Sequence, residues 1–158
     1  MIEATDIIIH ETAIIKRPEL VVMGSHIAID PFFYMTTCGL FGNWIHINSH
    51  VSVIGGISSQ LQIGDNVAIS TGCRLICRSN DFKSKTNAIP FKPGEKETYG
   101  VNIKIKDNVI LGANVVVLPD VTIGEGAVVG ANSLVKTDLD AWGIYAGTPA
   151  KKIGERHD

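Results

Sequence analysis

The sequence predicts an all-β fold, a parallel β-helix, from its composition and from a six-residue repeat. The 158 residues include 22 Ile and 14 Val but only 8 Leu, and β-branched side chains favour strands over helices. An apolar residue recurs at every sixth position, and Gly and Asn recur at fixed places after it. Such a repeat is typical of a solenoid, in which stacked coils share one core.

The repeat runs from Ile9 to Leu75 and resumes in the same register from Ile105 to Val135. Of its 18 positions, 17 hold Ile, Val, Leu or Phe. The residue four positions later is usually small or β-branched, as at Ala13, Ser25, Thr37, Ser49, Gly55, Val67, Cys73, Val109, Val115, Val121, Ala127 and Ser133. Large and small side chains thus alternate toward the interior, which predicts triangular coils of three hexads, about 18 residues each.

The corners of these coils are predicted by Gly and Asn, which tolerate positive φ. The pattern is clearest in Ile63-Gly-Asp-Asn and Val129-Gly-Ala-Asn. A period of six matches neither the α-helix nor the heptad, and the units of about 40 residues typical of a propeller are not visible.

Between Asn80 and Ile105 the repeat lapses, and residues 81–98 hold four Lys and two Pro. We expect a loop extruded from the β-helix here, and long loops of this kind are usually functional. Coils of 18 would stack two columns of outward side chains beside its base. The first column would hold His26, Trp44, Gln62 and Asn80, and the second His46, Gly64 and Phe82.

After the last hexads, Thr148 and Pro149 suit the N-cap and first position of a helix. The sequence therefore predicts a short C-terminal helix that caps the open end of the last coil.

The closing stretches 108–124 and 129–138 resemble the acetyl-CoA-binding end of the hexapeptide-repeat acyltransferases. The ending Trp142-Gly-Ile-Tyr-Ala-Gly-Thr-Pro-Ala-Lys-Lys-Ile, with Ser79-Asn80-Asp81-Phe82 upstream, is most similar to members acting on nucleotide-linked amino sugars and surface polysaccharides. The resemblance implies a left-handed β-helix, acetyl-CoA as co-substrate, and a homotrimer with sites between subunits. It also implies that the loop at 81–98 reaches the neighbouring subunit.

Size and charge narrow the function. A chain of 17.0 kDa is expected to form a single β-helix domain over residues 1–158. A net charge of −2 favours neither nucleic acid nor an anionic membrane as partner, and no apolar run reaches the roughly 18 residues of a membrane span. The three cysteines, Cys38, Cys73 and Cys77, lack a disulfide or metal-finger spacing, so we expect a cytoplasmic protein.

Transfer of an acetyl group from a thioester needs a proton acceptor, usually a histidine. The resemblance places the family's catalytic His at Asn80 of this chain, so another residue must serve. We expect His46 as the catalytic residue and His50, Trp44, Asn80 and Asp81 as substrate ligands. Asp81 equally suits a turn cap, and both histidines equally suit a solvated corner.

For acetyl-CoA, Gly112-Ala113 and Gly130-Ala131 lie 18 residues apart, at corners predicted to stack. Their small side chains would let a pantetheine arm lie along the ladder, although turns alone also explain them. Lys136, Lys151 and Lys152 are expected to bind the CoA phosphates.

The sequence therefore predicts an acetyl-CoA-dependent acetyltransferase that N-acetylates a nucleotide-linked amino sugar for O-antigen or capsule biosynthesis. O-acetylation of a polysaccharide, galactoside or antibiotic is an alternative, and a non-catalytic β-helix assembly module is another. No metal is expected, because His46 and His50 form the only pair with ligand spacing. A covalent cysteine mechanism is also weak, because neither Cys73 nor Cys77 has a histidine paired with it by spacing.

Overall fold

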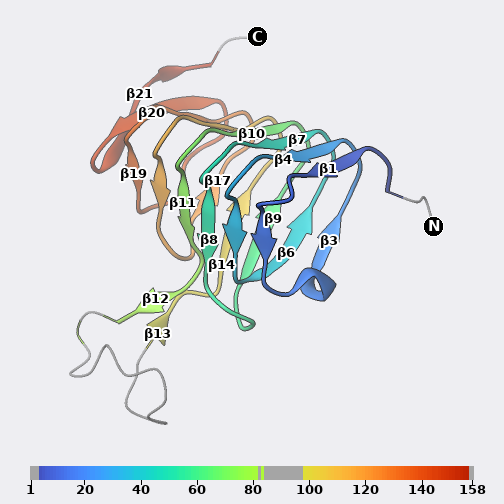
Figure 1. Ribbon diagram of the computed structural model, residues 1–158. Coiled ribbons are helices and arrows are strands. Elements are labelled where there is room, and N and C mark those ends of the chain that lie inside the picture. Colours follow the sequence, from blue (N-terminus) through green and yellow to red (C-terminus); the bar gives the residue numbers. More distant parts are fainter. Residues whose placement is uncertain (1–3, 82, 84–97, 157–158) are drawn as a thin grey trace.

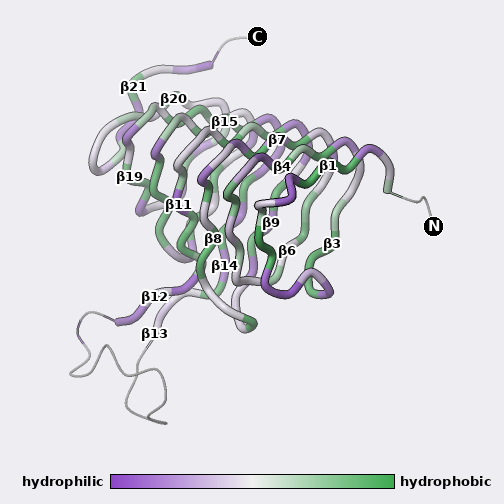
Figure 2. The backbone as a smooth tube through the Cα atoms, in the orientation of Figure 1, coloured by the Kyte–Doolittle hydropathy of each residue, from purple (hydrophilic) through white to green (hydrophobic). Residues whose placement is uncertain are grey.

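The computed structural model describes residues 4–81, 83 and 98–156 and forms a left-handed parallel β-helix, which confirms the predicted fold class. Successive short strands alternate among three sheets that make the sides of a triangular prism (Figure 1). Hydrophobic residues recur in every coil, whereas β12 is hydrophilic (Figure 2). No helix in the described ranges is long and apolar enough to cross a membrane.

Each sheet is named here by a letter. Sheet A contains, in spatial order, β1 (Ile7–Ile9), β4 (Ile27–Ile29), β7 (Ile45–Ile47), β10 (Val67–Ile69), β15 (Ile110–Leu111), β18 (Val128–Val129), β20 (Gly143–Gly147) and β21 (Ala150–Glu155). Sheet B contains β2 (Ile14–Ile15), β5 (Tyr34–Met35), β8 (Ser52–Ile54), β11 (Arg74–Ile76), β16 (Val116–Val117) and β19 (Leu134–Val135). Sheet C contains β3 (Val21–Met23), β6 (Cys38–Phe41), β9 (Gln60–Ile63), β14 (Asn102–Ile105) and β17 (Thr122–Ile123). A short 3-10 helix, η1 (Pro18–Leu20), precedes β3.

The three edges of the prism are called the A–B, B–C and C–A corners, after the sheets that they join. The chain passes them in that order in each coil. Five non-glycine residues of the C–A corner, from His26 to Trp142, have φ near +60°. The backbone hydrogen bonds between coils continue through this corner, as from Trp44 N to Ser25 O and from Asn66 N to Asn43 O.

Most of the predicted inward positions form the core, but the small residues Ala13, Ser25, Ser49 and Gly55 are only half-buried. From residue 27 onward, every hexad position except Ile57 is buried. Ile57 is 63% exposed because the B–C corner at residues 55–59 holds extra residues. Tyr34 pairs with Ser52, an offset of 18, but Cys38 pairs with Gln60, an offset of 22. This coil is therefore four residues longer than predicted.

The predicted C-terminal helix is wrong. Residues 150–155 form β21, which pairs antiparallel with β20, and Thr148 and Pro149 lie in the connecting turn. A helix over these residues would have had little apolar surface to bury, since Ile153 is the one large apolar residue between Lys151 and Arg156. As a strand, the segment satisfies backbone groups on the free edge of β20.

The segment that contains the excursion predicted at 81–98 leaves the solenoid at the B–C corner. Ser79–Asn80 (β12) pairs antiparallel with Thr98–Tyr99 (β13), and this two-stranded base projects from the solenoid (Figure 1). Residues 82 and 84–97 lie outside the described residues. The register is restored afterwards, because Ala68 pairs with Ile110 and Leu61 with Ile103.

Candidate active site

The residues predicted for the site lie in three separate places. Trp44 lies at the C–A corner and His46 lies next to it on sheet A. His50 lies at the A–B corner, as do the small residues Gly112 and Gly130. Asn80 lies at the B–C corner. Sheet A forms the side of the prism opposite the B–C corner. One chain therefore does not bring His46 and Asn80 together.

The predicted column from His26 to Asn80 is wrong beyond Trp44. Because the following coil has 22 residues, the residue above Trp44 is Asn66, and Asn108 follows it. Gln62 lies on sheet C instead, between Leu40 and Lys104. The second column fails for the same reason: His46 is flanked by Ala28 and Ala68 rather than Gly64, and Phe82 lies outside the described residues.

His46 is held by a carboxylate in a hollow of about 560 Å³ on sheet A. Its Nε2 lies 3.0 Å from Asp30 Oδ2. If Nε2 carries the ring proton, it donates a hydrogen bond to Asp30. Nδ1 then keeps a lone pair that can accept a proton from a substrate. Ala28 and Ala68 on either side leave the imidazole accessible. This arrangement can accept a proton from a reacting group.

An aromatic stack forms the edge of the same hollow. The rings of His26 and Trp44 lie 3.8 Å apart with an angle of 14° between their planes, and His26 Nδ1 is 3.2 Å from Asp6 Oδ2. Trp44 remains 59% exposed. An exposed indole in a hollow that also contains His46 and Asp6 is suited to the apolar face and the polar groups of a sugar or a base.

His50 lies apart from this hollow, at the A–B corner, where its ring stacks on Phe32 at 4.9 Å. No group of three or more His, Cys, Asp or Glu that could hold a metal ion occurs among residues 4–81, 83 and 98–156.

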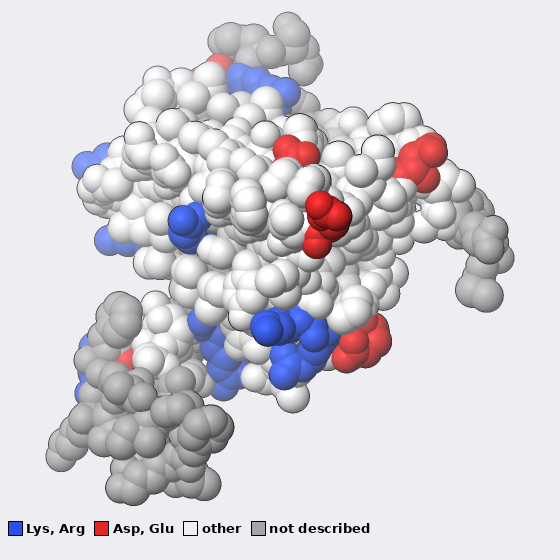
Figure 3. Space-filling view, in the orientation of Figure 1, with Lys and Arg blue, Asp and Glu red and all other residues white. Residues whose placement is uncertain are grey.

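The base of the excursion forms a second hollow of about 560 Å³, lined by Thr36, Ser58, Arg78, Asn80 and Thr98 among others. Arg78 Nε donates to Thr98 Oγ1 at 2.9 Å, and Nη1 donates to Ser58 Oγ at 2.6 Å. The long corner at 55–59 thus supplies one wall. Lys and Arg side chains gather on this side of the molecule (Figure 3). Asp81 Oδ1 accepts a hydrogen bond from Lys83 N at 2.9 Å, which is the geometry of a turn cap.

The small residues predicted for CoA do stack. Asn132 N donates to Ala113 O, and Gly112 N donates to Val129 O. A Cβ on Gly112 would lie 2.7 Å from Ala131 N, so the next coil alone requires a glycine there. Gly130 meets no such limit, because its nearest neighbour would be Ala146 Cβ at 3.3 Å.

The three lysines predicted to bind CoA come from two faces. Lys136 follows β19 of sheet B, whereas Lys151 and Lys152 lie in β21 of sheet A. Lys152 Nζ forms an ion pair with Glu155 at 2.6 Å, and this hydrogen bond raises the pKa of Lys152.

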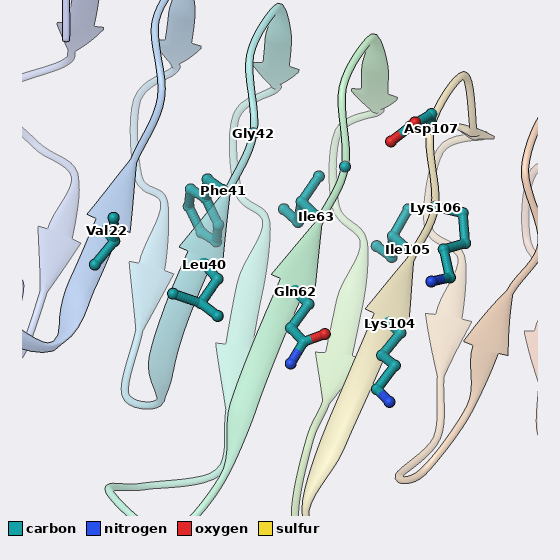
Figure 4. Close-up of a pocket in the computed structure, with 11 residues that line it drawn as sticks. Val22, Leu40, Phe41, Gly42, Gln62, Ile63, Lys104, Ile105, Lys106 and Asp107 are labelled. Carbon is teal, nitrogen blue, oxygen red and sulfur yellow. The ribbon is translucent and has the colours of Figure 1, made fainter. Parts of the chain in front are cut away.

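Sequence reasoning missed a hollow of about 340 Å³ on sheet C, which Lys104 and Lys106 help to line (Figure 4). The alternation Lys104-Ile105-Lys106 was its signal, because side chains two apart on a strand share a face. The two hollows on sheets A and C flank the C–A corner, which supplies Gly42 and Gly64 to one and Trp44 to the other.

The cysteines provide a prediction about reactivity. Burial raises the pKa of the Cys77 thiol to about 12 and also raises the pKa of Cys73. Because the thiolate is the reactive form, a thiol reagent at pH 8 is expected to label Cys38 in the native protein and to reach Cys73 and Cys77 only after unfolding. The Cys38→Ser variant should then show no fast-reacting thiol. Rapid labelling of a second cysteine in the native protein would reopen a covalent thiol mechanism.

Known proteins place this chain among the acyltransferases. Residues 102–137 match the family described as "Bacterial transferase hexapeptide (six repeats)". The chain is 33% identical to a dTDP-4-amino-4,6-dideoxy-D-glucose acyltransferase of Escherichia coli, over 85% of this chain and 71% of that protein. It is 29% identical to the galactoside O-acetyltransferase of Escherichia coli K12, over 94% of this chain and 73% of that protein. It is 39% identical over 95 residues to a putative acetyltransferase of Schizosaccharomyces pombe, but spans only 42% of that protein.

A solved structure is also similar over nearly the whole chain. AntD, an N-acyltransferase from Bacillus cereus in complex with dTDP-4-amino-4,6-dideoxyglucose and coenzyme A, has a TM-score of 0.92 and 30% sequence identity. The match covers 98% of this chain and 83% of AntD. Repeat, fold and relatives agree, and the chain therefore belongs to the hexapeptide-repeat family of acyl- and acetyltransferases.

Proposed function

We propose that this chain is an acetyl-CoA-dependent N-acetyltransferase of a nucleotide-linked amino sugar. The observation that carries the proposal is Asn80 at the base of the excursion, where the family resemblance places a catalytic His. A neutral amine is itself nucleophilic and needs only a proton acceptor, so this substitution favours an amine over a hydroxyl. Two similar proteins support this choice. The acyltransferase of Escherichia coli is named for a dTDP-linked amino sugar, and the structure of AntD contains one.

The reaction is a direct transfer between the two bound substrates. The amine nitrogen attacks the thioester carbonyl carbon, the C–S bond breaks, and CoA leaves as a thiolate. His46 takes the proton that the nitrogen loses and passes it to the thiolate, while the Asp30 carboxylate orients the imidazole and stabilises its charged form. Asn80 and Trp44 hold the sugar, and Gly130 with Ala131 lies along the pantetheine.

These groups meet only if the active site lies between chains. In a homotrimer with the three C–A corners toward a common axis, sheet C and the B–C corner of one chain face sheet A and the A–B corner of the next. Asn80 and Arg78 then share a cleft with His46 of the neighbour. The two hollows that flank the C–A corner support this arrangement, because they become opposite walls of that cleft.

The test of the proposed function is which acceptor, an amino sugar or a galactoside, receives the acetyl group. With acetyl-CoA, we expect dTDP-4-amino-4,6-dideoxyglucose to gain one acetyl group by mass spectrometry, with release of free CoA thiol, and a galactoside without an amine to remain unchanged. Preferential acetylation of the galactoside would replace the proposal with O-acetylation. Absence of acetyl-CoA binding by calorimetry would instead favour a non-catalytic assembly module.

O-acetylation is a second candidate function, which the His46 and Asp30 pair favours. A hydroxyl acceptor requires a base more strictly than an amine does, and this pair can provide one. Competition between an amino sugar and its hydroxyl analogue at equal concentration separates the two functions.

The proposal extends to the cellular setting. The whole chain, 1–158, acts as one β-helix domain in the cytoplasm, and the acetylated sugar serves O-antigen or capsule biosynthesis. Free Cys38, Cys73 and Cys77 are consistent with a reducing compartment.

A further inference from the structure

A row of outward side chains crosses sheet C at equivalent positions of four strands. Val22 pairs with Leu40, Leu40 with Gln62, and Gln62 with Lys104. Adjacent strands lie about 4.8 Å apart, so the row spans about 14 Å. It forms one side of the hollow of about 340 Å³, with Lys106 at the corner beside it (Figure 4).

Two lysine side chains, Lys104 and Lys106, line one end of this hollow. Among residues 4–81, 83 and 98–156, neither Lys104 nor Lys106 takes part in an ion pair. The one carboxylate in the lining belongs to Asp107, whose Oδ1 accepts a hydrogen bond from Asp65 N at 2.9 Å. Asp65 Oδ1 in turn accepts one from Asn43 N at 2.6 Å. The nearby carboxylates are thus engaged by the corner backbone.

The opposite end of the hollow is apolar. Val22 is 64% exposed and Leu40 is 43% exposed, and Gln62 lies between them and the lysines with its amide bonded to Gln60 Oε1 at 2.5 Å. Solvated surface lysines do not require an apolar neighbour of this kind. A ligand that combines a strongly anionic group with a less polar body would match both ends.

The glycines Gly42 and Gly64 at the C–A corner are required by the packing of the coils. A Cβ on Gly42 would meet Gly64 backbone atoms at 2.9 Å, and a Cβ on Gly64 would meet Asp107 N at 2.9 Å. Their small size is explained by the stacking of the coils, and the side chains of the row and of Lys106 are what distinguish this face.

We propose that Lys104 and Lys106 bind a diphosphate group in this hollow, with the less polar part of the same ligand on Val22 and Leu40. Both substrates of the proposed acyl transfer carry a diphosphate, the nucleotide sugar and CoA, so the chemistry is shared between two sources. The assignment rests on the proposed function for its choice of ligands. Its readout is phosphate binding, which remains measurable if no acetyl group is transferred.

Calorimetry with the full-length protein tests the assignment. The probes are dTDP against thymidine, and CoA against pantetheine, with wild type, Lys104→Gln, Lys106→Gln and the double variant. The control is Lys16→Gln, because Lys16 is an exposed lysine beside the Tyr34 ring, 5.9 Å from its centroid. We expect the double variant to bind dTDP or CoA at least about tenfold more weakly, with the thymidine and pantetheine affinities unchanged and the control like wild type.

The two sources give different results. Weaker binding confined to dTDP identifies the nucleotide sugar, and weaker binding confined to CoA identifies the acyl donor. Unchanged affinities for both dTDP and CoA, in a double variant with wild-type circular dichroism and elution volume, overturn the assignment. In that case normal acetylation of the amino sugar by the same variant would leave the proposed function intact.

Discussion

The His46→Asn variant is expected to acetylate dTDP-4-amino-4,6-dideoxyglucose about 100-fold more slowly than wild type, with kcat rather than KM carrying the loss. His46 is an accessible imidazole oriented by a carboxylate, with its Nε2 at 3.0 Å from Asp30 Oδ2. Asparagine keeps a polar side chain but cannot take up the proton. Steady-state kinetics with both substrates varied measures the effect.

The matched control for this change is His10→Asn. His10 is an exposed histidine whose Nδ1 contacts Thr12 Oγ1 at 3.0 Å in the first coil, and it has no proposed role. Asp30→Asn should fall between the two, since it removes the group that orients His46 but leaves the imidazole. An unchanged kcat in His46→Asn would remove this residue from catalysis.

Mixing two impaired variants tests whether His46 acts across a subunit boundary. Neither His46→Asn nor Asn80→Ala alone would have an intact site, but a mixed trimer would restore some sites at interfaces that combine two unaltered surfaces. Co-refolding in equal amounts should recover about a quarter of the wild-type sites. No recovery of activity would contradict a site shared between chains.

The Gly112→Ala variant is expected to lower the free energy of unfolding by about 1–3 kcal/mol, as overpacked sites commonly do. The added methyl group would lie 2.7 Å from Ala131 N and 2.9 Å from Val129 O, both of which are backbone atoms of the next coil. The backbone cannot rotate away as a side chain would. For a chain of this length each kcal/mol corresponds to a Tm lower by about 2–4 °C, which differential scanning calorimetry resolves.

Gly130→Ala is the matched control, because Gly130 occupies the equivalent position one coil later. Its added methyl group would meet Ala146 Cβ at 3.3 Å and Tyr145 O at 3.4 Å, so its Tm should stay close to that of wild type. If the pantetheine arm lies along this corner, the same variant should bind acetyl-CoA more weakly. Equal stability losses in both variants would argue against the packing explanation for Gly112.

The inward residues could be predicted because a β-helix converts sequence period directly into burial. Val67, Cys73, Val115 and Val117 were all expected inside and all are buried. The prediction that Ile57 faces the core is wrong, because an apolar residue at the expected spacing looks the same in the sequence whether it faces the core or lies in an enlarged corner. The doublet Gly55-Gly56 was the available signal, since Gly56 has φ +88°.

The candidate site could be predicted only in part. The sequence indicates His46 as a candidate base, and the structure shows it hydrogen-bonded to Asp30. Which of them are neighbours depends on the length of each coil, and the four extra residues after β8 moved Asn66 rather than Gln62 above Trp44. Sequence spacing thus predicts which residues are neighbours within one coil. It does not predict neighbours in different coils, because each insertion shifts all the residues that follow it.

The B–C corner contains both the extra residues at 55–59 and the start of the excursion between β12 and β13. Changes in the length of this segment are therefore separated from the coils. The solenoid on either side is already paired, Ala68 with Ile110 and Leu61 with Ile103, although these partners are 42 residues apart in the chain. The entropy of closing such a loop grows only with the logarithm of its length, so doubling the segment would cost about 0.6 kcal/mol. The coils on either side would therefore keep almost all of their stability if this one segment were lengthened or rewritten.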